Sequence, residues 1–413
     1  MTLEELKGEV SRELTENILP FWIDKMTDPA GGYYGRIDGE GKLVPGAEKG
    51  LILNARILWT FSQAYRMLGK PEYLEAASRA AKYISEQFVD REFGGAYWSL
   101  TADGKPLDTK KQFYAIAFAV YGLAEYSRAV TPDQIGGLKD GRSEPAMTSG
   151  DALKLAISLY KSIEEHSFDA QKNGYIEACT REWGAIEDMR LSDKDENFAK
   201  TMNTHLHILE AYTGLYRVWK DEGLHTQLAN LIRLFLDKII QPDGHLGLFF
   251  DEDWNLHGKM QSFGHDIETS WLLVEAAEVL CESGDPMDRL LYLECLGASR
   301  DLAAAASEGL TVEGMIYEFD PESGYRKEDR DWWVQAEAVV GYLNRWQLAG
   351  DPADLERAYA EWEYIKSKII APNGEWYWGR RADGSVNRDD DRAGFWKCPY
   401  HNGRMCMELL QRI

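Results

Sequence analysis

The sequence has 413 residues, of which 44% are hydrophobic and 28% are charged, and this is the composition of an ordinary globular protein. It excludes a disordered chain, a collagen-like chain and a small disulfide-rich scaffold. The 69 acidic and 46 basic residues give a formal charge of −23, which repels a phosphate backbone, so nucleic acid is not an expected partner.

The charge and cysteine patterns favour a protein of the cytoplasm. Acidic residues follow Met1 where a signal peptide needs positive charge and an apolar run, and no stretch of about 18 apolar residues occurs later. The five cysteines lie far apart without a Cys-x-x-Cys pair, so we expect buried free thiols. We therefore predict a cytoplasmic protein with no membrane partner.

Two kinds of helix alternate along the chain. The first kind is amphipathic, with apolar residues at i, i+3 and i+4, and is predicted at residues 3–26, 73–89, 151–168, 225–240, 288–304 and 354–370. The second kind is apolar on nearly all sides and is predicted at residues 53–61, 112–126, 202–219, 263–280, 331–348 and 401–413. A helix that is apolar all round is buried on both sides, so the first kind is expected outside and the second inside.

A short turn motif follows each amphipathic helix. It joins glycine, alone or after Asn, Asp or Glu, to an aromatic or aliphatic residue, which is the chemistry of a tight turn opening a short strand. The six copies recur every 60 to 80 residues, roughly, and begin at Gly31, Gly94, Asn173, Asp243, Glu313 and Asn373. The pattern predicts an all-α (α/α)6 barrel of six inner and six outer helices with short β-hairpin-like connections.

The barrel is expected to form a single catalytic domain over residues 1–413. Two unrelated helical bundles would also supply twelve helices, but they would not explain six similar turns. Residues 131–150, with their Pro, Gly, Asp and Ser, are expected to form a surface loop in the third repeat.

Polar residues gather where the inner helices begin. In a parallel ring these first turns converge on one axial cavity, and they contain Asn54, Arg56, Tyr114, Asn203, His205, His207, His265, Glu268, Trp332, Trp333, Glu337, Trp396, Tyr400 and His401. Half of the eight histidines belong to this set. Buried polar groups need partners or a wet cavity, so this concentration predicts the functional site.

Helical spacing assigns some of these residues to faces. Asn203 and His207 are four apart and share a face, so His207 is expected to face the cavity and His205 to be structural. His265 and Glu268 are three apart on one face, which can fix a histidine tautomer or raise its basicity. A helix-start ion pair without a catalytic role is the alternative for this second pair.

The tryptophans can be sugar-stacking platforms or core residues. Adjacent Trp332 and Trp333 point about 100° apart on a helix, so at most one of them can face the axis squarely. Trp333 and Trp396 are the preferred stacking candidates, because flat amphipathic rings suit the apolar faces of sugars.

Neither a metal nor a nucleotide is expected. Three histidines and a carboxylate could hold zinc, but the chain has no His-Glu-x-x-His, and any metal site would have to be assembled from separate helices. Neither a phosphate-binding Gly-x-x-x-x-Gly-Lys-Ser/Thr nor a strand-linked Gly-x-Gly-x-x-Gly motif occurs. We therefore predict a protein without a metal or other cofactor.

Five strings of the sequence together resemble the N-acylglucosamine 2-epimerase superfamily, most closely its cellobiose 2-epimerase branch. They are Asn-Ala-Arg-Ile-Leu-Trp-Thr-Phe from Asn54, Met-Asn-Thr-His-Leu-His from Met202, Phe-Gly-His-Asp-Ile-Glu from Phe263, Trp-Trp-Val-Gln-Ala-Glu from Trp332, and Phe-Trp-Lys-Cys-Pro-Tyr-His-Asn from Phe395. The resemblance covers essentially the whole chain, and its fold is an (α/α)6 barrel.

The resemblance implies epimerisation at C2 of the reducing-end glucose of β-1,4-linked disaccharides such as cellobiose, lactose and mannobiose, without a cofactor. It implies that His265 and His401 are the acid/base pair and that His207 assists ring opening. It also implies that Arg56, Tyr114 and Asn203 contact O1 to O3, that Glu268 and Glu337 orient the histidines and bind hydroxyls, and that Trp333 and Trp396 stack on the sugars. Trp332 belongs to the same expected binding set, and the protein is expected to be a monomer or a weak homodimer.

Three other functions remain open at this point. An aldose–ketose isomerase or a monosaccharide 2-epimerase would use the same enediolate. An inverting glycosidase would use a pair of carboxylates with room for a water, for which Asp266, Glu268 and Glu337 are the candidates. A non-catalytic sugar-binding protein is disfavoured, because binding alone needs no convergent arginine and histidines.

Overall fold

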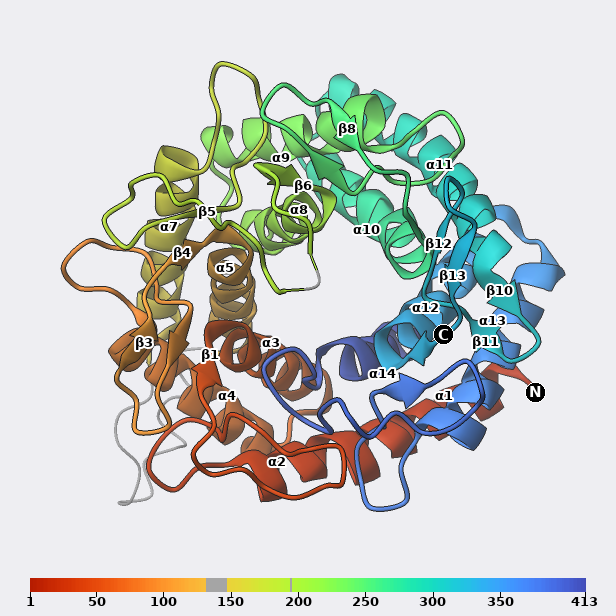
Figure 1. Ribbon diagram of the computed structural model, residues 1–413, viewed down its shortest axis with the longest axis horizontal. Helices are drawn as coiled ribbons and strands as arrows, with labels where there is room; N and C mark the ends of the chain where they lie inside the picture. The colour runs from red at the N-terminus through yellow and green to blue at the C-terminus, as the bar shows by residue number, and fades with distance from the viewer. Residues whose placement is uncertain (131–146, 194) are drawn as a thin grey trace.

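The computed structural model describes residues 1–130, 147–193 and 195–413, and these residues form two concentric rings of helices (Figure 1). The inner ring consists of α3 (Leu51–Leu68), α5 (Phe113–Ala129), α8 (Met202–Tyr216), α10 (Phe263–Cys281), α12 (Trp332–Ala349) and α14 (Tyr400–Arg412). The outer ring consists of α1 (Leu3–Arg12) with α2 (Leu19–Met26), then α4 (Pro71–Tyr83), α7 (Ser149–His166), α9 (Glu222–Leu234), α11 (Pro286–Ala306) and α13 (Pro352–Tyr364). The predicted (α/α)6 barrel is confirmed.

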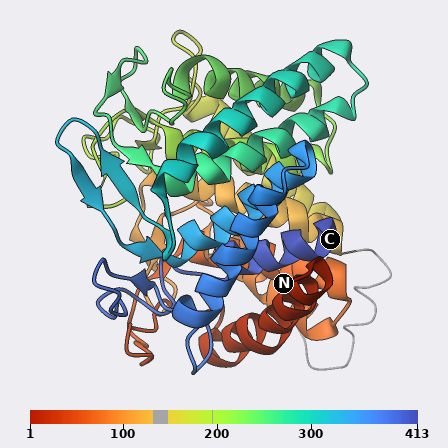
Figure 2. The same ribbon diagram turned by 90° about the vertical axis from the view of Figure 1, so that its right-hand side faces the viewer.

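The inner ring closes on itself. Each inner helix packs against the next along the chain, and α14 packs back against α3. Figure 2 shows the two ends of the chain on the same side of the molecule, where α1 lies against α14. The outer ring closes between its last and first helices, where Trp362 Nε1 of α13 donates a 2.8 Å hydrogen bond to Glu9 Oε2 of α1.

Helix boundaries differ from the predicted ones for local reasons. The outer helices α4, α7, α9, α11 and α13 begin two or three residues earlier than hydrophobic periodicity alone predicted. Asp221, Asp285 and Asp351 cap three of them by accepting hydrogen bonds from first-turn backbone N–H groups, and such capping residues lie outside the apolar pattern. Short π-helical turns at Glu13–Ile18, Ile84–Phe88, Phe235–Ile239 and Ile365–Ile369, and a 3-10 turn at Ser307–Gly309, complete the outer helices.

The six predicted turns are tight hairpin connections. Antiparallel bridges flank them at Thr27 with Tyr33, Val89 with Ala96, Phe168 with Tyr175, Ile240 with Leu246, Leu310 with Met315 and Ile370 with Trp376. Asn173 and Gly174 have φ angles of 63° and 89°, which explains the Asn-Gly sequence there, because these residue types reach the left-handed region at low cost.

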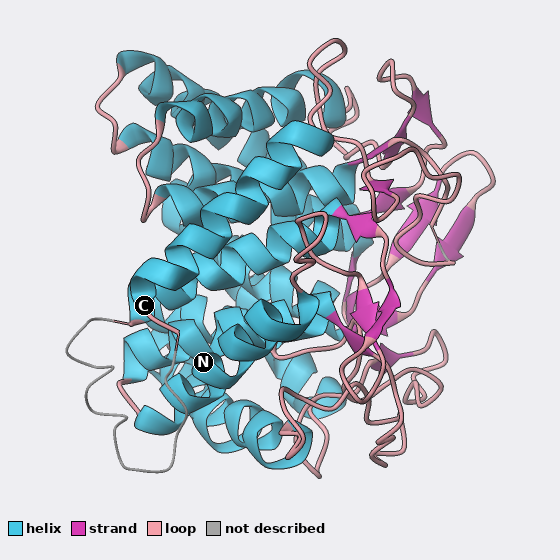
Figure 3. Cartoon of the chain, turned by 90° about the vertical axis from the view of Figure 1, so that its left-hand side faces the viewer, coloured by secondary structure: helices cyan, strands magenta, loops and turns pink. Residues whose placement is uncertain are grey.

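Short strands link successive repeats at one end of the barrel (Figure 3). The strand before each of five inner helices pairs antiparallel with a strand of the following repeat: β1 (Lys49–Gly50) with β2 (Ser99–Leu100), β4 (Lys111–Gln112) with β5 (Ala178–Cys179), β6 (Lys200–Thr201) with β7 (Phe249–Phe250), β9 (Gln261–Ser262) with β12 (Glu318–Asp320), and β14 (Arg330–Asp331) with β15 (Gly379–Arg380). The remaining strands are β3 (Pro106–Asp108), β8 (Leu256–His257), β10 (Leu310–Thr311), β11 (Gly314–Met315) and β13 (Tyr325–Lys327). These pairings keep the first turns of the inner helices together at this end of the barrel.

Three buried lysines connect the hairpin turns to the strands that precede the inner helices. Lys49, Lys111 and Lys200 form ion pairs of 2.6, 2.8 and 3.1 Å with an aspartate of the preceding turn. Each ammonium group also donates to a turn carbonyl oxygen, so the buried charge has several partners. This repeat of buried lysines was not predicted from the sequence.

The predicted surface loop at residues 131–150 is only partly covered by the structure. Residues 131–146 lie outside the described residues, and α7 already begins at Ser149, so the predicted loop extends too far. All five cysteines are free thiols. Within the described residues, no helix is both long and apolar enough to cross a membrane.

Candidate active site

The predicted site residues lie at the end of the barrel where the inner helices begin. The second and sixth residues of these helices turn toward one another across the axis: Tyr114 and Phe118 of α5, Asn203 and His207 of α8, Trp333 and Glu337 of α12, with Arg56, Glu268 and His401 at one such position of α3, α10 and α14. This spacing of four residues places both side chains on one helix face. The repeat of helix starts therefore builds one site from six separated segments.

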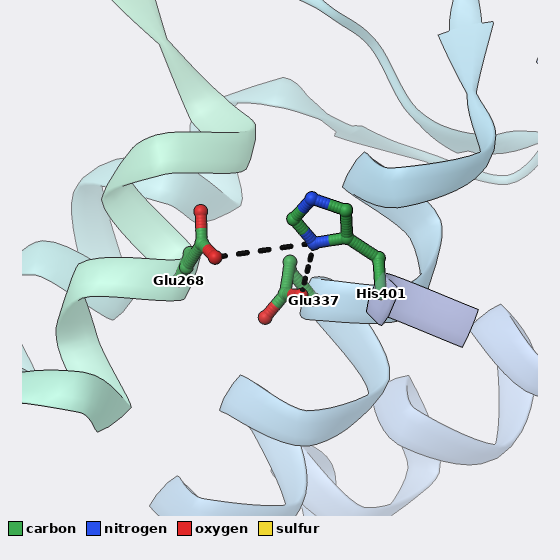
Figure 4. Close-up of side chains that lie close together, drawn as sticks. All are labelled: Glu268, Glu337 and His401. Carbon is green, nitrogen blue, oxygen red and sulfur yellow. Dashed lines mark hydrogen bonds and ion pairs between the residues drawn. The ribbon is translucent and has the colours of Figure 1, made fainter. Parts of the chain in front are cut away.

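His401 is held by carboxylates of two other helices. Its Nδ1 lies 2.7 Å from Glu337 Oε1 and 3.9 Å from Glu268 Oε1 (Figure 4). A neutral imidazole that donates from Nδ1 keeps a lone pair on Nε2. Burial, with the positive charges of Arg56 and Arg404, holds the pKa of His401 well below its ordinary value, so the ring is neutral and available as a base.

His207 has the same type of support. Its Nδ1 lies 3.0 Å from Glu210 Oε2 on the same helix, and its ring packs against Tyr114 and Phe118. Burial lowers the pKa of His207 against the opposing effect of Glu210. His205 faces away from the site, because its Nε2 accepts from the Tyr175 backbone N–H at 2.9 Å, and its predicted structural role agrees with this contact.

His265 is positioned by a serine and not by Glu268, which corrects the suggested pair. Its Nδ1 lies 2.7 Å from Ser262 Oγ, while Glu268 forms its hydrogen bond with Arg404. Burial lowers the pKa of His265 to about 3, so this histidine is also neutral. His265 is the third residue of α10, and its ring faces the mouth of the site.

Trp333 lies between two of the histidines. Its ring centroid is 4.7 Å from that of His265 and 5.7 Å from that of His401. A Cβ atom on Gly264 would lie 2.6 Å from the Trp333 ring, so glycine is required for this close approach. Trp332 packs edge-on against Trp378, with ring centroids 4.6 Å apart, and its ring centroid lies 6.4 Å from that of His401.

Arg56 and Tyr114 form the opposite wall. Arg56 Nη2 donates to Tyr114 Oη at 2.8 Å, and Nη1 donates to the Trp396 backbone oxygen at 3.3 Å. The guanidinium lies over the Phe118 ring at 4.1 Å, and its Nε has no hydrogen-bond partner among the described residues. Trp396 is half-buried and packs against Trp98 and Tyr114.

A cavity of about 540 Å³ at the strand end of the barrel reaches His265. Among the residues that line it are Phe198, Asn203, Phe249, His265, Tyr317 and Lys327. The side-chain oxygen of Asn203 is buried without a partner among the described residues, which leaves it available to a hydroxyl group of a ligand. Tyr317, which meets the Trp333 ring edge-on at 6.0 Å, was missed because it lies in a loop outside the helix starts.

Arg404 and Glu210 were also missed by the sequence analysis. Arg404 is 1% exposed and donates through Nη2 to Glu268 at 2.6 Å and Glu337 at 2.7 Å, and through Nη1 to Glu210. Tyr400 donates to Glu210 as well. An arginine in a helix that is predicted to be buried on both sides is a signal that could have identified Arg404, because a buried guanidinium needs acidic partners.

The carboxylates do not form the pair that an inverting glycosidase needs. Asp266 accepts from His245 Nδ1 at 2.7 Å and from the Leu246 backbone N–H at 3.0 Å, so it fastens a hairpin turn. Oxygens of Glu268 and Glu337 both lie within 2.7 Å of one Arg404 nitrogen. They are therefore closer than the roughly 6.5 Å at which an inverting pair leaves room for water.

Glu268, Glu337 and His401 gather closely enough to be considered as ligands for a metal ion. The guanidinium of Arg404 already supplies positive charge to both carboxylates through hydrogen bonds. These contacts form an ion-pair network, and we do not assign the three residues as metal ligands.

Three buried histidines and an arginine at the axis of an α/α barrel are residue types that enzymes use for general acid–base catalysis. A family model described as N-acylglucosamine 2-epimerase matches residues 32–402, so the chain belongs to the N-acylglucosamine 2-epimerase family.

Close relatives fall in one branch of that family. The chain is 56% identical to a cellobiose 2-epimerase of Bacteroides fragilis over 98% of this chain and 99% of the relative, and 39% identical to one of Ruminococcus albus over 98% of both chains. The solved structure of the cellobiose 2-epimerase from Bacillus thermoamylovorans superimposes with a TM-score of 0.89 at 38% identity, over 99% of this chain and 100% of the relative.

Proposed function

We propose that this protein epimerises C2 of the reducing-end glucose of β-1,4-linked disaccharides, with cellobiose as the first substrate to test and a mannose-ended disaccharide as the product. The observation that carries the proposal is the pair of neutral histidines, His265 and His401, on two inner helices with Trp333 between them. The 56% identity to a cellobiose 2-epimerase supports the choice of substrate.

The reaction begins with opening of the sugar ring, because the C2 proton is acidic only next to an open-chain aldehyde. A proton moves from O1 to O5 as the ring bond breaks, and neutral His207 is placed to assist this transfer. The Trp333 and Trp396 rings support the flat faces of the sugar, and the Asn203 oxygen accepts from a hydroxyl.

Epimerisation then needs two bases on opposite faces of C2. One of the two histidines, His265 or His401, removes the C2 proton and becomes an imidazolium, while the electron pair moves onto O1 and creates an enediolate. The other histidine takes up a proton from solvent and returns it to C2 from the opposite face. The first histidine releases its proton to solvent, and ring closure gives the epimer. Arg56 places positive charge where the enediolate develops.

The cavity beside His265 supports a disaccharide over a single sugar. With about 540 Å³ beyond His265, it has room for a second sugar ring outside the site of proton transfer. We also propose that the barrel is one catalytic domain of a cytoplasmic monomer or weak homodimer, and the five free cysteines are in keeping with a reducing compartment.

Product analysis tests this function. Chelator-treated protein incubated with cellobiose is expected to yield a disaccharide with mannose at its reducing end and no free glucose. The His401→Gln variant serves as the blank. Free glucose would establish a glycosidase, a fructose-ended product an isomerase, and turnover of single sugars alone a monosaccharide epimerase, and each of these results would overturn the proposal.

A further inference from the structure

The buried guanidinium of Arg404 connects three inner helices beneath the active site. It is 1% exposed, and its nitrogens donate to Glu210 of α8, Glu268 of α10 and Glu337 of α12. These three carboxylates are the acidic groups that lie against His207 and His401. Arg404 itself forms no hydrogen bond with either imidazole among the described residues, so any effect on catalysis passes through the carboxylates.

Glu210 and Glu337 each contact both Arg404 and a histidine. Glu210 uses Oε1 for Arg404 and Oε2 for His207 Nδ1, and Glu337 Oε1 contacts both Arg404 and His401 Nδ1. A carboxylate that is held in place and ionised requires the imidazole to donate from Nδ1, which leaves Nε2 as the free base. Arg404 therefore influences the tautomer of both His207 and His401.

We propose that Arg404 is the positioning residue that holds Glu210 and Glu337 in place, and thereby sets the Nδ1–H tautomer of His207 and His401 and keeps both rings neutral. This inference rests on the proposed function only for the choice of activity assay. It goes beyond that function, since the fold alone does not demand one cation shared by three acidic groups.

The charged groups around His401 explain why the loss of Arg404 would change the protonation of this histidine. The charged or titratable groups that face it are Arg56 of α3, His207 and Glu210 of α8, Glu268 of α10, Glu337 of α12, and Tyr400 and Arg404 of α14. Three of these groups are acidic and two are arginines. Without Arg404, the carboxylates would draw a proton onto the imidazole and convert the base into an imidazolium.

Two substitutions separate the charge of Arg404 from its geometry. Arg404→Met removes the cation, and we expect kcat to fall about 10- to 100-fold with little change in KM. The pKa of His401 should rise, because a positive charge that lowers it is removed. Because the base works only when neutral, the acid limb of the kcat/KM profile should move to higher pH. Arg404→Lys retains the charge, so its acid limb should stay near that of the parent, but one ammonium cannot bridge three carboxylates and kcat should remain low.

Arg412→Met is the matched control. Arg412 lies two turns further along α14 and bonds Glu408 at 2.8 Å and Asn344 at 3.0 Å, away from all three histidines. It should leave the acid limb and kcat unchanged. A parental acid limb in a folded Arg404→Met protein would overturn the proposal and leave Arg404 with a structural role alone.

A spectrum of the resting protein tests the same proposal without turnover. With ¹⁵N-labelled histidine, the parent should show His207 and His401 as Nδ1–H tautomers, and Arg404→Lys should show mixed tautomers at one or both. Nε2–H tautomers in the parent would overturn the proposal even if Arg404→Met failed to fold. A protein with the expected tautomers but no epimerase activity would sink the proposed function and leave this inference standing.

Discussion

Replacing His265 or His401 with glutamine is expected to lower kcat for epimerisation by about 10²- to 10⁴-fold, the range that a positioned acid/base group contributes. Glutamine retains hydrogen bonding and approximate size, so KM should change much less. His401 is tied to Glu337 at 2.7 Å and His265 to Ser262 at 2.7 Å, and each ring is thereby aimed by a partner of its own. Steady-state kinetics on cellobiose measure the effect.

A matched substitution distinguishes loss of chemistry from loss of fold. His225 lies on the outer helix α9, where its Nε2 contacts Asp288 at 2.8 Å, far from the axial cavity. His225→Gln should retain parental kcat, and all three variants should keep the helical circular dichroism of the parent. Near-parental turnover in His265→Gln or His401→Gln would remove that histidine from the acid/base pair.

The second large effect is expected at Arg56. Arg56→Met should lower kcat about 10²- to 10³-fold, because the enediolate would develop its charge without the cation that the folded site holds in place. Arg56→Lys should recover part of the loss, since it restores charge but not the fork that reaches both Tyr114 Oη and the Trp396 backbone oxygen. The measurement is kcat and KM on cellobiose.

Whether Arg56→Met changes kcat or KM distinguishes between two roles for Arg56. A cation that acts on the intermediate changes kcat and kcat/KM together, whereas one that only binds the ground-state sugar raises KM. A raised KM with parental kcat would therefore contradict the assigned role.

The fold could be predicted because its signals are local. The turns at Asn173-Gly174 and at the five equivalent places need a left-handed backbone, and this need is visible in residue type alone. The alternation of amphipathic and wholly apolar helices then separated the outer from the inner ring. The ion pairs of Lys49, Lys111 and Lys200 could not be predicted, because each joins a strand to an aspartate that precedes a turn, and surface lysines share the same sequence appearance.

The site could be predicted only as far as helix faces determine it. Spacing placed His207 with Asn203 and assigned His205 to structure, but it does not say which neighbouring helix a side chain meets. Glu268 was therefore considered as the partner of His265, whereas its hydrogen bond goes to Arg404, 136 positions later. Asp266 and His205 hold hairpin turns from the same fourth helical position, a shared feature that becomes apparent only once the turns are in place.

The most direct test of two-face proton transfer is a proton NMR time course of the chelator-treated protein and its two histidine variants with cellobiose, or with its mannose-ended epimer, in D2O. The parent should produce the epimer with deuterium at C2. Each single variant should fail to invert C2, yet it should exchange the C2 proton of one epimer only, and the two variants should act on opposite epimers, because one base remains on one face. Inversion without deuterium at C2, or exchange of the same epimer by both variants, would contradict the account.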